Sequence, residues 1–286
     1  MLRSPENLGI IHFIGIGGIG MSGIAEILIQ SGYVVQGSDI NESKNTARLK
    51  KLGVKIFIGH QKSNIKNAKI IVVSTAISQT NEELVTGKKM FLPIVHRAEM
   101  LGELMRLKQS IAIAGTHGKT TTTSLIAKMI EENGMDPTII NGGIISSLGS
   151  NAKLGKGKWM VVEADESDGS FAKLNPTAAI VTNIDLEHLD YHKTEENLET
   201  AFLNFLSSIP FYGFVCLCID HRRTQKLISK LEDKKVITYG LSATADIRAT
   251  NIIYKNNKMH FSLNISNRRN ESIKIHQFEF SVKIYN

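Results

Sequence analysis

The sequence predicts an α/β protein in which an N-terminal Rossmann-like parallel-sheet domain is followed by a P-loop-type α/β central domain. Apolar runs of strand length alternate with segments of helical periodicity along most of the chain. Several runs are apolar throughout, as expected for parallel strands that helices cover on both faces. Two glycine-rich turns, at residues 15–20 and 115–118, each follow such a run and precede a helical segment. Each turn therefore opens its own β-α series, which indicates two nucleotide-binding sheets.

The elements follow in order along the chain. The expected strands are Ile10–Ile16, Tyr33–Gln36, Ile70–Val73, Ser110–Ala114, Trp159–Glu163, Ala178–Thr182, Gly213–Ile219 and Lys235–Tyr239. The expected helices are Gly20–Ser31, Glu42–Leu52, Arg97–Leu107, Lys119–Asn133, Glu195–Ile209 and Arg222–Leu231. Near residue 246 the pattern changes to the strand-like segments Asp246–Asn251, Lys258–Ile265 and Ser272–Phe280. We place a boundary at Leu107–Gln109, so that the predicted domains are residues 1–107 and 108–286.

The composition narrows the classes of protein that the chain can represent. Its 286 residues are 42% hydrophobic and 21% charged, which is typical of a globular protein with sizeable cores. The net charge of +7 arises from 34 Lys and Arg against 27 Asp and Glu, and it suits nucleic acid or anionic small molecules such as nucleotides. Because no basic stretch interleaved with aromatic residues and no zinc-finger spacing is present, we expect no nucleic-acid binding.

Two features could suggest another cellular setting. Residues 8–25 carry no Asp, Glu, Lys or Arg, as a signal peptide or membrane span would. They contain six glycines and change from a strand pattern to a helix pattern, so we expect no membrane insertion and a cytoplasmic location. The two cysteines, Cys216 and Cys218, share an apolar strand, which favours two reduced core thiols over a redox or metal-binding pair.

The first glycine-rich turn has the pattern G-x-G-x-x-G, with Gly15, Gly17 and Gly20 at its fixed positions. Glycines let backbone amides approach a diphosphate at a helix N-terminus. Asp39 lies 19 residues beyond Gly20, where a carboxylate could hold a ribose hydroxyl. By this turn alone a nicotinamide dinucleotide is the default ligand, although any diphosphate nucleotide suits the same geometry. A purely structural glycine turn is the alternative interpretation.

The second turn, Gly115-Thr116-His117-Gly118-Lys119-Thr120-Thr121, runs from a buried strand into a helix. Its amides and the helix dipole are suited to hold phosphates, Lys119 to neutralise their charge, and the Thr120 hydroxyl to bind Mg²⁺. The spacing departs from the usual P-loop, which would need a glycine at Ile113. We nevertheless predict a phosphate-binding loop rather than a simple glycine turn.

Polar residues follow two later strands at the edge where those phosphates would lie. Glu163 ends an apolar strand and opens the acidic segment 163–168, so we predict that Glu163 binds the metal. For Glu166 in the same segment, a solvated acidic loop is the favoured interpretation. His188 follows the next strand, but Mg²⁺ prefers oxygen ligands, and chemistry alone therefore leaves His188 unassigned.

Together these motifs resemble the Mur ligase family. The second turn, Glu163–Asp168 and Thr182–Ile184 with His188 are similar to the ATP and metal elements of that family. Six further segments resemble the branch of the family that joins L-alanine to UDP-N-acetylmuramate. They are His12–Glu26, Gly37–Asp39, Ser74–Ile77, Arg97–Leu101, Tyr239–Gly240 and Ala245–Ala249. The resemblance covers most of the chain.

The resemblance reassigns the ligand of the first turn from a dinucleotide to a UDP-sugar. It implies that UDP-muramate is bound by Gly15, Gly17, Gly18, Gly20, Ser38, Asp39, His60 and Thr75. It implies that ATP is bound by Gly115, Thr116, His117, Gly118, Lys119, Thr120, Thr121 and Asn183. It also implies that Thr120, Glu163 and His188 hold Mg²⁺, and that Lys119, Glu163 and His188 are the catalytic residues.

The implied reaction is the ATP-dependent joining of L-alanine to UDP-N-acetylmuramate through an acyl phosphate, in cytoplasmic peptidoglycan synthesis that supports cell shape and division. Two departures from the family stand out. Residues 220–222 read Asp-His-Arg where relatives have Asp-Asp-Pro, and the sequence stops at Asn286 without the expected third, C-terminal domain. The alternatives are a ligase of murein recycling that attaches a peptide, a silent fragment that binds UDP-muramate and ATP, and a nicotinamide oxidoreductase.

Overall fold

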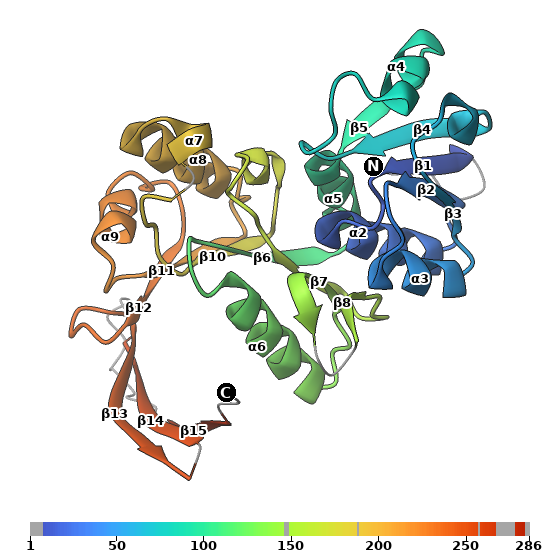
Figure 1. Cartoon of the computed structure of the whole chain (residues 1–286). Helices are drawn as coiled ribbons and strands as arrows, with labels where there is room; N and C mark the ends of the chain where they lie inside the picture. The colour runs from blue at the N-terminus through green and yellow to red at the C-terminus, as the bar shows by residue number, and fades with distance from the viewer. Residues whose placement is uncertain (1–7, 146–148, 188, 257, 267–277, 284–286) are drawn as a thin grey trace.

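The computed structural model describes residues 8–145, 149–187, 189–256, 258–266 and 278–283. In this part of the chain the strands form two sheets, each accompanied by helices, and the predicted α/β class is confirmed (Figure 1). Strand order is β3-β2-β1-β4-β5 in the first sheet. In the second sheet it is β15-β14-β13-β12-β11-β10-β6-β9-β7-β8.

The first sheet is parallel throughout. Its strands are β1 (Ile10–Ile14), β2 (Val35–Asp39), β3 (Lys55–Ile58), β4 (Ala68–Val73) and β5 (Ile94–His96). Its helices are α2 (Ile19–Gln30), α3 (Lys44–Lys51), α4 (Glu82–Lys89) and α5 (Arg97–Met105), with the 3₁₀ turn η1 (Lys62–Ile65). The chain reverses its direction of travel across the sheet between β1 and β4, and open α/β sheets bind ligands beyond the carboxyl ends of strands at such a point. The turn after β1 lies there.

The second sheet has a parallel centre and antiparallel ends. The parallel strands are β6 (Gln109–Ala114), β7 (Thr138–Ile145), β9 (Trp159–Glu163), β10 (Ala178–Val181), β11 (Phe214–Cys218) and β12 (Val236–Gly240). At one end β8 (Ser150–Lys153) pairs antiparallel with β7. At the other, β13 (Ile247–Lys255) continues parallel from β12 and pairs antiparallel with β14 (Lys258–Ile265), which pairs with β15 (Phe278–Lys283).

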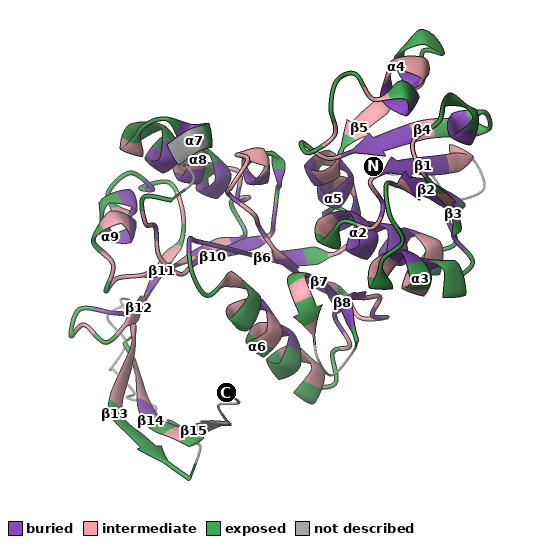
Figure 2. Cartoon of the chain, in the orientation of Figure 1, coloured by how far each residue is buried: buried purple, intermediate pink, exposed green. Residues whose placement is uncertain are grey.

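Helices α6 (Lys119–Glu132), α7 (Leu189–His192), α8 (Glu195–Ser207) and α9 (Arg222–Ile228) and the 3₁₀ turn η2 (Ser170–Lys173) accompany this sheet. Its central strands are buried, whereas β13 and β14 project outward and are largely intermediate or exposed (Figure 2). Beneath α8, the ring of Phe171 packs on Phe202 and Phe205 with centroids 5.0 and 5.1 Å apart. Aromatic pairs at such distances contribute beyond the area that they bury.

The predicted helices and the first eight predicted strands are all present, with shifted ends. The largest shift is at Tyr33–Gln36, where β2 instead begins at Val35 and runs to Asp39. The sequence analysis did not predict α4, the short strands β3 and β5 on the two edges of the first sheet, or the β7–β8 hairpin. Residues 272–277 of the last predicted strand lie outside the described residues.

The apolar segment at residues 8–25 forms β1, the glycine turn and the start of α2. No helix among the described residues has both the length and the apolar character that a membrane crossing requires. Cys216 and Cys218 are free thiols on β11, as predicted, and burial raises the pKa of Cys216 to about 11. A thiol with that pKa is protonated at neutral pH and has little nucleophilic character.

Helix α2 of the first sheet packs against β7 and β8 of the second, and α5 packs against η2. Residues 106–108 connect α5 to β6. These contacts place the N-terminal sheet and its helices against the β7–β8 hairpin and η2 of the second. We retain the division at residue 107 as a proposal.

Candidate active site

The first glycine-rich turn is held by the end of β2. Gly15, with φ +79°, and Ile16 both donate their N–H to the Ser38 carbonyl, at 2.8 and 3.0 Å. The Gly17 N–H donates to Asp39 Oδ2 at 2.8 Å. A Cβ on Gly17 would lie 2.9 Å from that same oxygen, so a larger residue there would displace the Asp39 carboxylate. Asp39, predicted to contact the UDP-sugar, therefore also shapes the turn itself.

Behind this turn lies a buried polar cluster centred on Glu83 of α4. The Glu83 carboxylate accepts from Ser38 Oγ at 2.5 Å and from Asn64 Nδ2 at 2.6 Å, and it lies 3.1 Å from His12 Nε2. His60 Nδ1 lies 2.9 Å from Ser38 Oγ. Burial alone raises the pKa of Glu83, but hydrogen bonds from His12, Ser38 and Asn64 outweigh it and hold that pKa below its ordinary value. Ser38 is completely buried in this cluster, whereas His60 is partly exposed.

The second turn uses two left-handed glycines and one asparagine. Gly115 has φ +128° and Gly118, at the N-cap of α6, has φ +80°, which are backbone conformations that glycine adopts without strain. Asn183 accepts from the His117 N–H at 2.8 Å and donates to the His117 carbonyl at 3.0 Å. Asn183 thus fixes the loop, and Thr121 is exposed at the start of α6. Backbone amides at a helix N-terminus of this kind bind phosphate.

Lys119 is partly buried and contacts the carboxylate of Glu166, for which the sequence favours a solvated position. Its Nζ donates to the carbonyls of Gly115 and Thr116, at 2.7 and 3.2 Å, and to Glu166 at 2.9 Å. Glu166 is only 1% exposed, so the prediction of a solvated Glu166 was wrong. Burial raises the pKa of Glu166, and the Lys119 charge only partly opposes that rise.

Two of the three predicted metal ligands meet. Thr120 Oγ1 lies 2.9 Å from Glu163 Oε2, and the Gly142 N–H also donates to that oxygen at 2.8 Å. A hydroxyl beside a carboxylate suits Mg²⁺, which prefers oxygen ligands. The third, His188, lies outside the described residues. Within those residues, no three His, Cys, Asp or Glu side chains form a group able to hold a metal.

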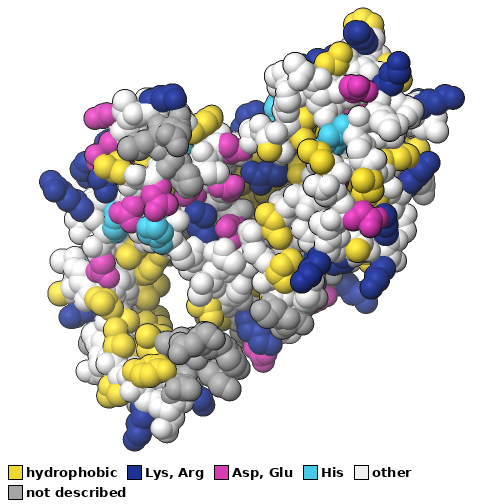
Figure 3. Space-filling model, in the orientation of Figure 1, with side chains coloured by type: hydrophobic (Ala, Val, Ile, Leu, Met, Phe, Trp, Pro, Cys, Tyr) yellow, Lys and Arg dark blue, Asp and Glu magenta, His cyan; other side chains and the backbone are white. Residues whose placement is uncertain are grey.

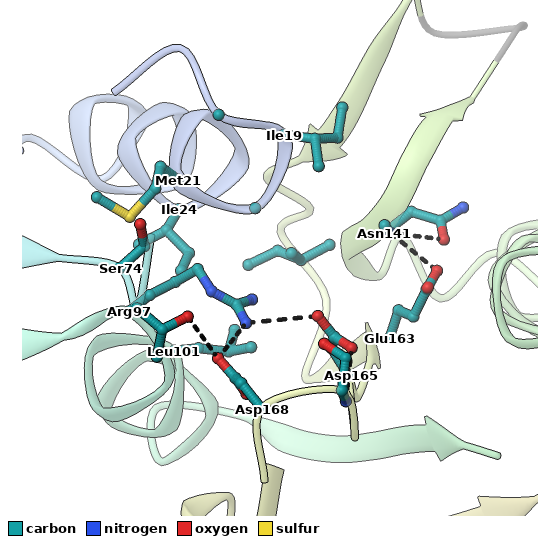
Figure 4. A pocket seen from close by; sticks show the side chains of 16 residues that line it. Ile19, Met21, Ile24, Ser74, Arg97, Leu101, Asn141, Glu163, Asp165 and Asp168 are labelled. Carbon is teal, nitrogen blue, oxygen red and sulfur yellow. Dashed lines mark hydrogen bonds and ion pairs between the residues drawn. The ribbon is translucent and has the colours of Figure 1, made fainter. Parts of the chain in front are cut away.

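A cleft of about 360 Å³ separates the two halves of the site (Figure 4). Gly18 and Gly20 of the first turn line one side, and Asn141 and Glu163 line the other. Figure 4 shows the Arg97 side chain, from the start of α5, reaching across toward the acidic segment. The first turn and the carboxylate beside the second therefore face one cavity.

The Arg97 guanidinium links the first turn to that acidic segment. It lies 3.6 Å from Asp165 and 3.8 Å from Asp168, and Thr75 Oγ1 donates to Asp168 at 3.1 Å. A Cβ on Gly20 would be 3.0 Å from Arg97 Nη1, so this glycine leaves room for the guanidinium. Burial raises the pKa of Asp168, but the hydrogen bonds that its carboxylate accepts from Ser170 and Thr75, together with the Arg97 charge, outweigh burial and lower that pKa.

The structure thus places Gly18, Gly20, Thr75 and Glu163 along the cleft, with Ser38 behind it. Sequence reasoning missed Arg97, Asn141, Asp165 and Asp168 as lining residues and Glu166 as the partner of Lys119. The signal was partly present, because Arg97 opens a quoted motif and the three acidic residues belong to segment 163–168.

Charged side chains are distributed unevenly over the surface. On the face shown in Figure 3, Lys and Arg side chains are scattered, while acidic and histidine side chains gather on the lobe of the second sheet. Beside the second turn, Asp185 lies 3.3 Å from His117 Nε2 and 3.2 Å from His221 Nε2.

Two family models match the chain and together span most of it. Residues 10–109 match the model described as "Mur ligase family, catalytic domain", and residues 113–282 match "Mur ligase middle domain". The first match covers the strands and helices of the first sheet, and the second covers those of the second sheet except most of β6.

Curated relatives are similar over nearly the whole of this chain. A UDP-N-acetylmuramate–L-alanine ligase from Rhodospirillum rubrum is 56% identical over 252 residues, which are 88% of this chain and 52% of the relative. One from Methylocella silvestris is 56% identical over 268 residues, which are 94% of this chain and 57% of the relative. The chain therefore spans little more than half the length of these relatives.

Solved structures share the fold. UDP-N-acetylmuramate-alanine ligase from Thermotoga maritima superposes with a TM-score of 0.82 at 27% identity, covering 97% of this chain and 61% of that one. A UDP-N-acetylmuramate:L-alanyl-γ-D-glutamyl-meso-diaminopimelate ligase from Neisseria meningitides has the same TM-score at 23% identity, covering 90% of this chain and 84% of that one. At that lower identity the likeness shows the fold alone.

Proposed function

The chain belongs to the Mur ligase family, and from that premise we propose that it binds UDP-N-acetylmuramate and ATP and serves the joining of L-alanine to the muramate. The observation that carries the proposal is the shared cleft, which has the first glycine-rich turn on one side and Glu163, bonded to Thr120 of the second turn, on the other. One ligand on each turn would present its reactive end to the same cavity. Relatives 56% identical carry the name of this ligase, which favours L-alanine as the acceptor.

The first turn receives the UDP-linked substrate. The amides of residues 15–18 donate within the protein, so the amides of Ile19 and Gly20, at the N-terminus of α2, are the ones suited to the diphosphate. Arg97 supplies the cation that the turn itself lacks, because its guanidinium lies beside Gly20. On this proposal Asp39 and His60 contact the nucleoside, and Thr75, which lines the cleft, contacts the muramate side of the substrate. Ser38 acts from behind, through His60 and Glu83.

The second turn receives ATP. Residues 115–121 supply amides for the phosphates, Asn183 keeps the loop in shape, and Lys119 neutralises the transferring phosphate. Glu166 holds Lys119 close to the loop carbonyls, and the ammonium is therefore already ordered before a phosphate arrives. Ordering a charged donor in advance lowers the cost of using it in the transition state.

The reaction then has two steps. A carboxylate oxygen of the muramate attacks the γ-phosphorus of ATP, giving an acyl phosphate and ADP. The amine of L-alanine attacks the acyl carbon, and the tetrahedral intermediate loses phosphate and a proton to give the amide. The enzyme contributes position and charge neutralisation more than covalent chemistry.

Thr120 and Glu163 fit Mg²⁺, and His188 is proposed as the third ligand on the family resemblance. Mg²⁺ bound there would neutralise phosphate charge during transfer. Glu163 would stay oriented by the Gly142 amide. On this proposal the protein acts in the cytoplasm, in peptidoglycan synthesis.

Isothermal titration with UDP-N-acetylmuramate and with Mg²⁺ and a non-hydrolysable ATP analogue tests the binding. We expect saturable binding of both and none of NADH or NADPH. Chromatographic assay for UDP-muramoyl-alanine, with L-alanine or a tripeptide as acceptor, tests the reaction. Product with the tripeptide but not with alanine would instead assign the chain the function of the murein-recycling ligases. Binding of both nucleotides without any product would limit its role to binding, and failure to bind ATP with magnesium present would overturn the proposal.

A further inference from the structure

A buried asparagine joins the β7–β8 hairpin to the first turn of α2. Asn151 of β8 is completely buried, and its Nδ2 donates to the Ile19 carbonyl at 2.7 Å and to the Asn141 carbonyl at 3.3 Å. Its Oδ1 accepts from Arg48 Nη2 at 3.0 Å. The side-chain amide therefore has partners on α2, α3 and β7. A buried amide with its groups satisfied in this way has one preferred orientation.

Helix α2 is shaped to receive this side chain. A Cβ on Gly23 would lie 2.6 Å from Asn151 Nδ2, closer than side-chain atoms approach one another. Glycine in a helix interior is unfavourable relative to alanine, so the close approach of the hairpin explains its presence. Beside it, Glu26 accepts from Ser150 Oγ at 2.8 Å and pairs with Arg48 at 3.0 Å. The contact is thus a fitted polar interface.

The other end of this hydrogen-bond chain lies in the second turn. Asn141 of β7 donates from Nδ2 to Ser124 Oγ at 2.9 Å and to the Thr120 carbonyl at 3.4 Å, both on α6. The Gly142 N–H contacts Asn141 Oδ1 at 3.0 Å and Glu163 at 2.8 Å. Figure 4 shows Ile19 and Asn141 on facing sides of the cleft. A continuous path therefore runs from Ile19 through Asn151 and Asn141 to Thr120 and Glu163.

We propose that Asn151 is a positioning residue for the ligation, which sets the first glycine-rich turn against Thr120 and Glu163. This inference rests on the proposed function, in which two ligands held by different sheets must meet. A misplacement of about 1 Å can cost roughly 100-fold in rate when two reactants must be aligned. Because the same residues order both turns, filling one turn favours binding at the other.

Titration of one ligand with and without the other measures this coupling. The probes are UDP-N-acetylmuramate and the non-hydrolysable ATP analogue with Mg²⁺. For the unmodified chain we expect each probe to tighten the other by about fivefold or more, by the same factor in both directions. Absence of binding by either probe alone would refute the proposed function, whereas binding without coupling would refute only the role of Asn151.

The discriminating variant is Asn151→Asp, which keeps the oxygen that faces Arg48 but removes both Nδ2 donors. We expect each single dissociation constant to stay within about twofold and the coupling to vanish. Gly23→Ala attacks the same contact from α2, and alanine favours the helix, so it secures the test should Asn151→Asp fold poorly. Coupling retained in both variants, or either probe's own affinity lost in both, overturns the positioning role.

A matched control is Thr238→Val in β12. Thr238 is also completely buried, and it exchanges hydrogen bonds of 2.8 and 3.0 Å with Asp246, away from the cleft. Its loss removes a comparable buried polar contact, so we expect lower stability with the coupling intact. Loss of coupling in Thr238→Val as well would show that general destabilisation, and not Asn151, is responsible.

Discussion

The two glycine-rich turns have the same local architecture but are supported differently. Each follows a buried parallel strand and precedes a helix. The second turn carries its own cation, since Lys119 follows Gly118 directly and folds back on the loop carbonyls. The first carries none, and the amides of residues 15–18 already donate within the protein, that of Gly17 to Asp39. Its nearest cation is Arg97, which comes from α5 and is shared with two aspartates.

A buried glutamate lies near each turn, and the pKa values of the two glutamates are shifted in opposite directions. Glu83 receives several hydrogen bonds that stabilise its charge, and its pKa is lowered. Glu166 is opposed by burial that Lys119 only partly offsets, and its pKa is raised. The charged carboxylate of Glu83 therefore stabilises the fold. Burial of the charged Glu166 carboxylate instead costs free energy, while the carboxylate keeps Lys119 in position. The difference teaches that two similar turns are accompanied by carboxylates in opposite environments, one stabilised in its charged form by hydrogen bonds and one destabilised by burial.

Removal of the cation of the second turn should give the largest effect. Lys119→Ala should reduce phosphoryl transfer by about 1,000-fold or more, because a charged donor at the transferring phosphate is lost. The affinity for UDP-N-acetylmuramate should stay within about twofold, since that site lies on the other sheet. Acyl-phosphate trapping and calorimetry measure the two. Lys128→Ala on the same helix, which removes only an exposed pair with Glu132, serves as the control. Comparable loss of UDP-N-acetylmuramate affinity, measured without ATP, would contradict the assignment of the two ligands to separate turns.

Removal of the carboxylate behind the first turn should affect stability next most strongly. Glu83→Ala leaves the buried partners His12, Ser38 and Asn64 without their acceptor, which should cost about 3 kcal/mol of unfolding free energy. Chemical denaturation measures it. The exposed Glu82→Ala, one residue earlier on α4, should change the free energy by less than about 0.5 kcal/mol. Equal effects would mean that the buried cluster adds nothing to the fold.

The next largest effect is expected from removal of Arg97, the cation that α5 places beside the first turn. Arg97→Ala should weaken UDP-N-acetylmuramate binding by about 10-fold, the usual value of a charged hydrogen bond to a partly exposed group. Affinity for the ATP analogue should hardly change. Arg97→Lys should restore part of the binding, because the charge returns without the planar fork. An unchanged affinity for the UDP-sugar in Arg97→Ala would remove this residue from the first site.

The smallest expected effect is a difference between Glu83 and Glu166 in how their contributions to stability depend on pH. Because the pKa of Glu83 is lowered, its contribution to stability is present above the ordinary glutamate value of 4.5 and is lost as pH falls through its folded pKa. Because the pKa of Glu166 is raised, its contribution is present below 4.5 and is lost as pH rises through its folded pKa. The measured quantity is the unfolding free energy of the unmodified chain minus that of Glu83→Gln, and separately minus that of Glu166→Gln. These two differences should change in opposite directions as pH rises. Parallel slopes would contradict the assigned environments.

The sequence by itself determined the α/β class, the order of most elements and both phosphate-type turns. These features are local, because a buried parallel strand is apolar along its length and a turn before a helix needs glycine within a few residues. The positions of Lys119 and Thr120 at the start of a helix could be predicted in this way. The edge strands β3 and β5 are too short for their periodicity to be read, and Gly142 and Gly143 mask the strand pattern of β7.

Tertiary structure alone decided which distant residues meet. The burial of Glu166 against Lys119, the approach of Arg97 to Gly20, and the contact of Asn151 with Ile19 join residues 47, 77 and 132 positions apart. An acidic or amide side chain has the same sequence pattern whether it is solvated or buried beside a partner. Only the packing of α2 and α5 against the second sheet fixes its surroundings, and these surroundings set its charge, its orientation and its role.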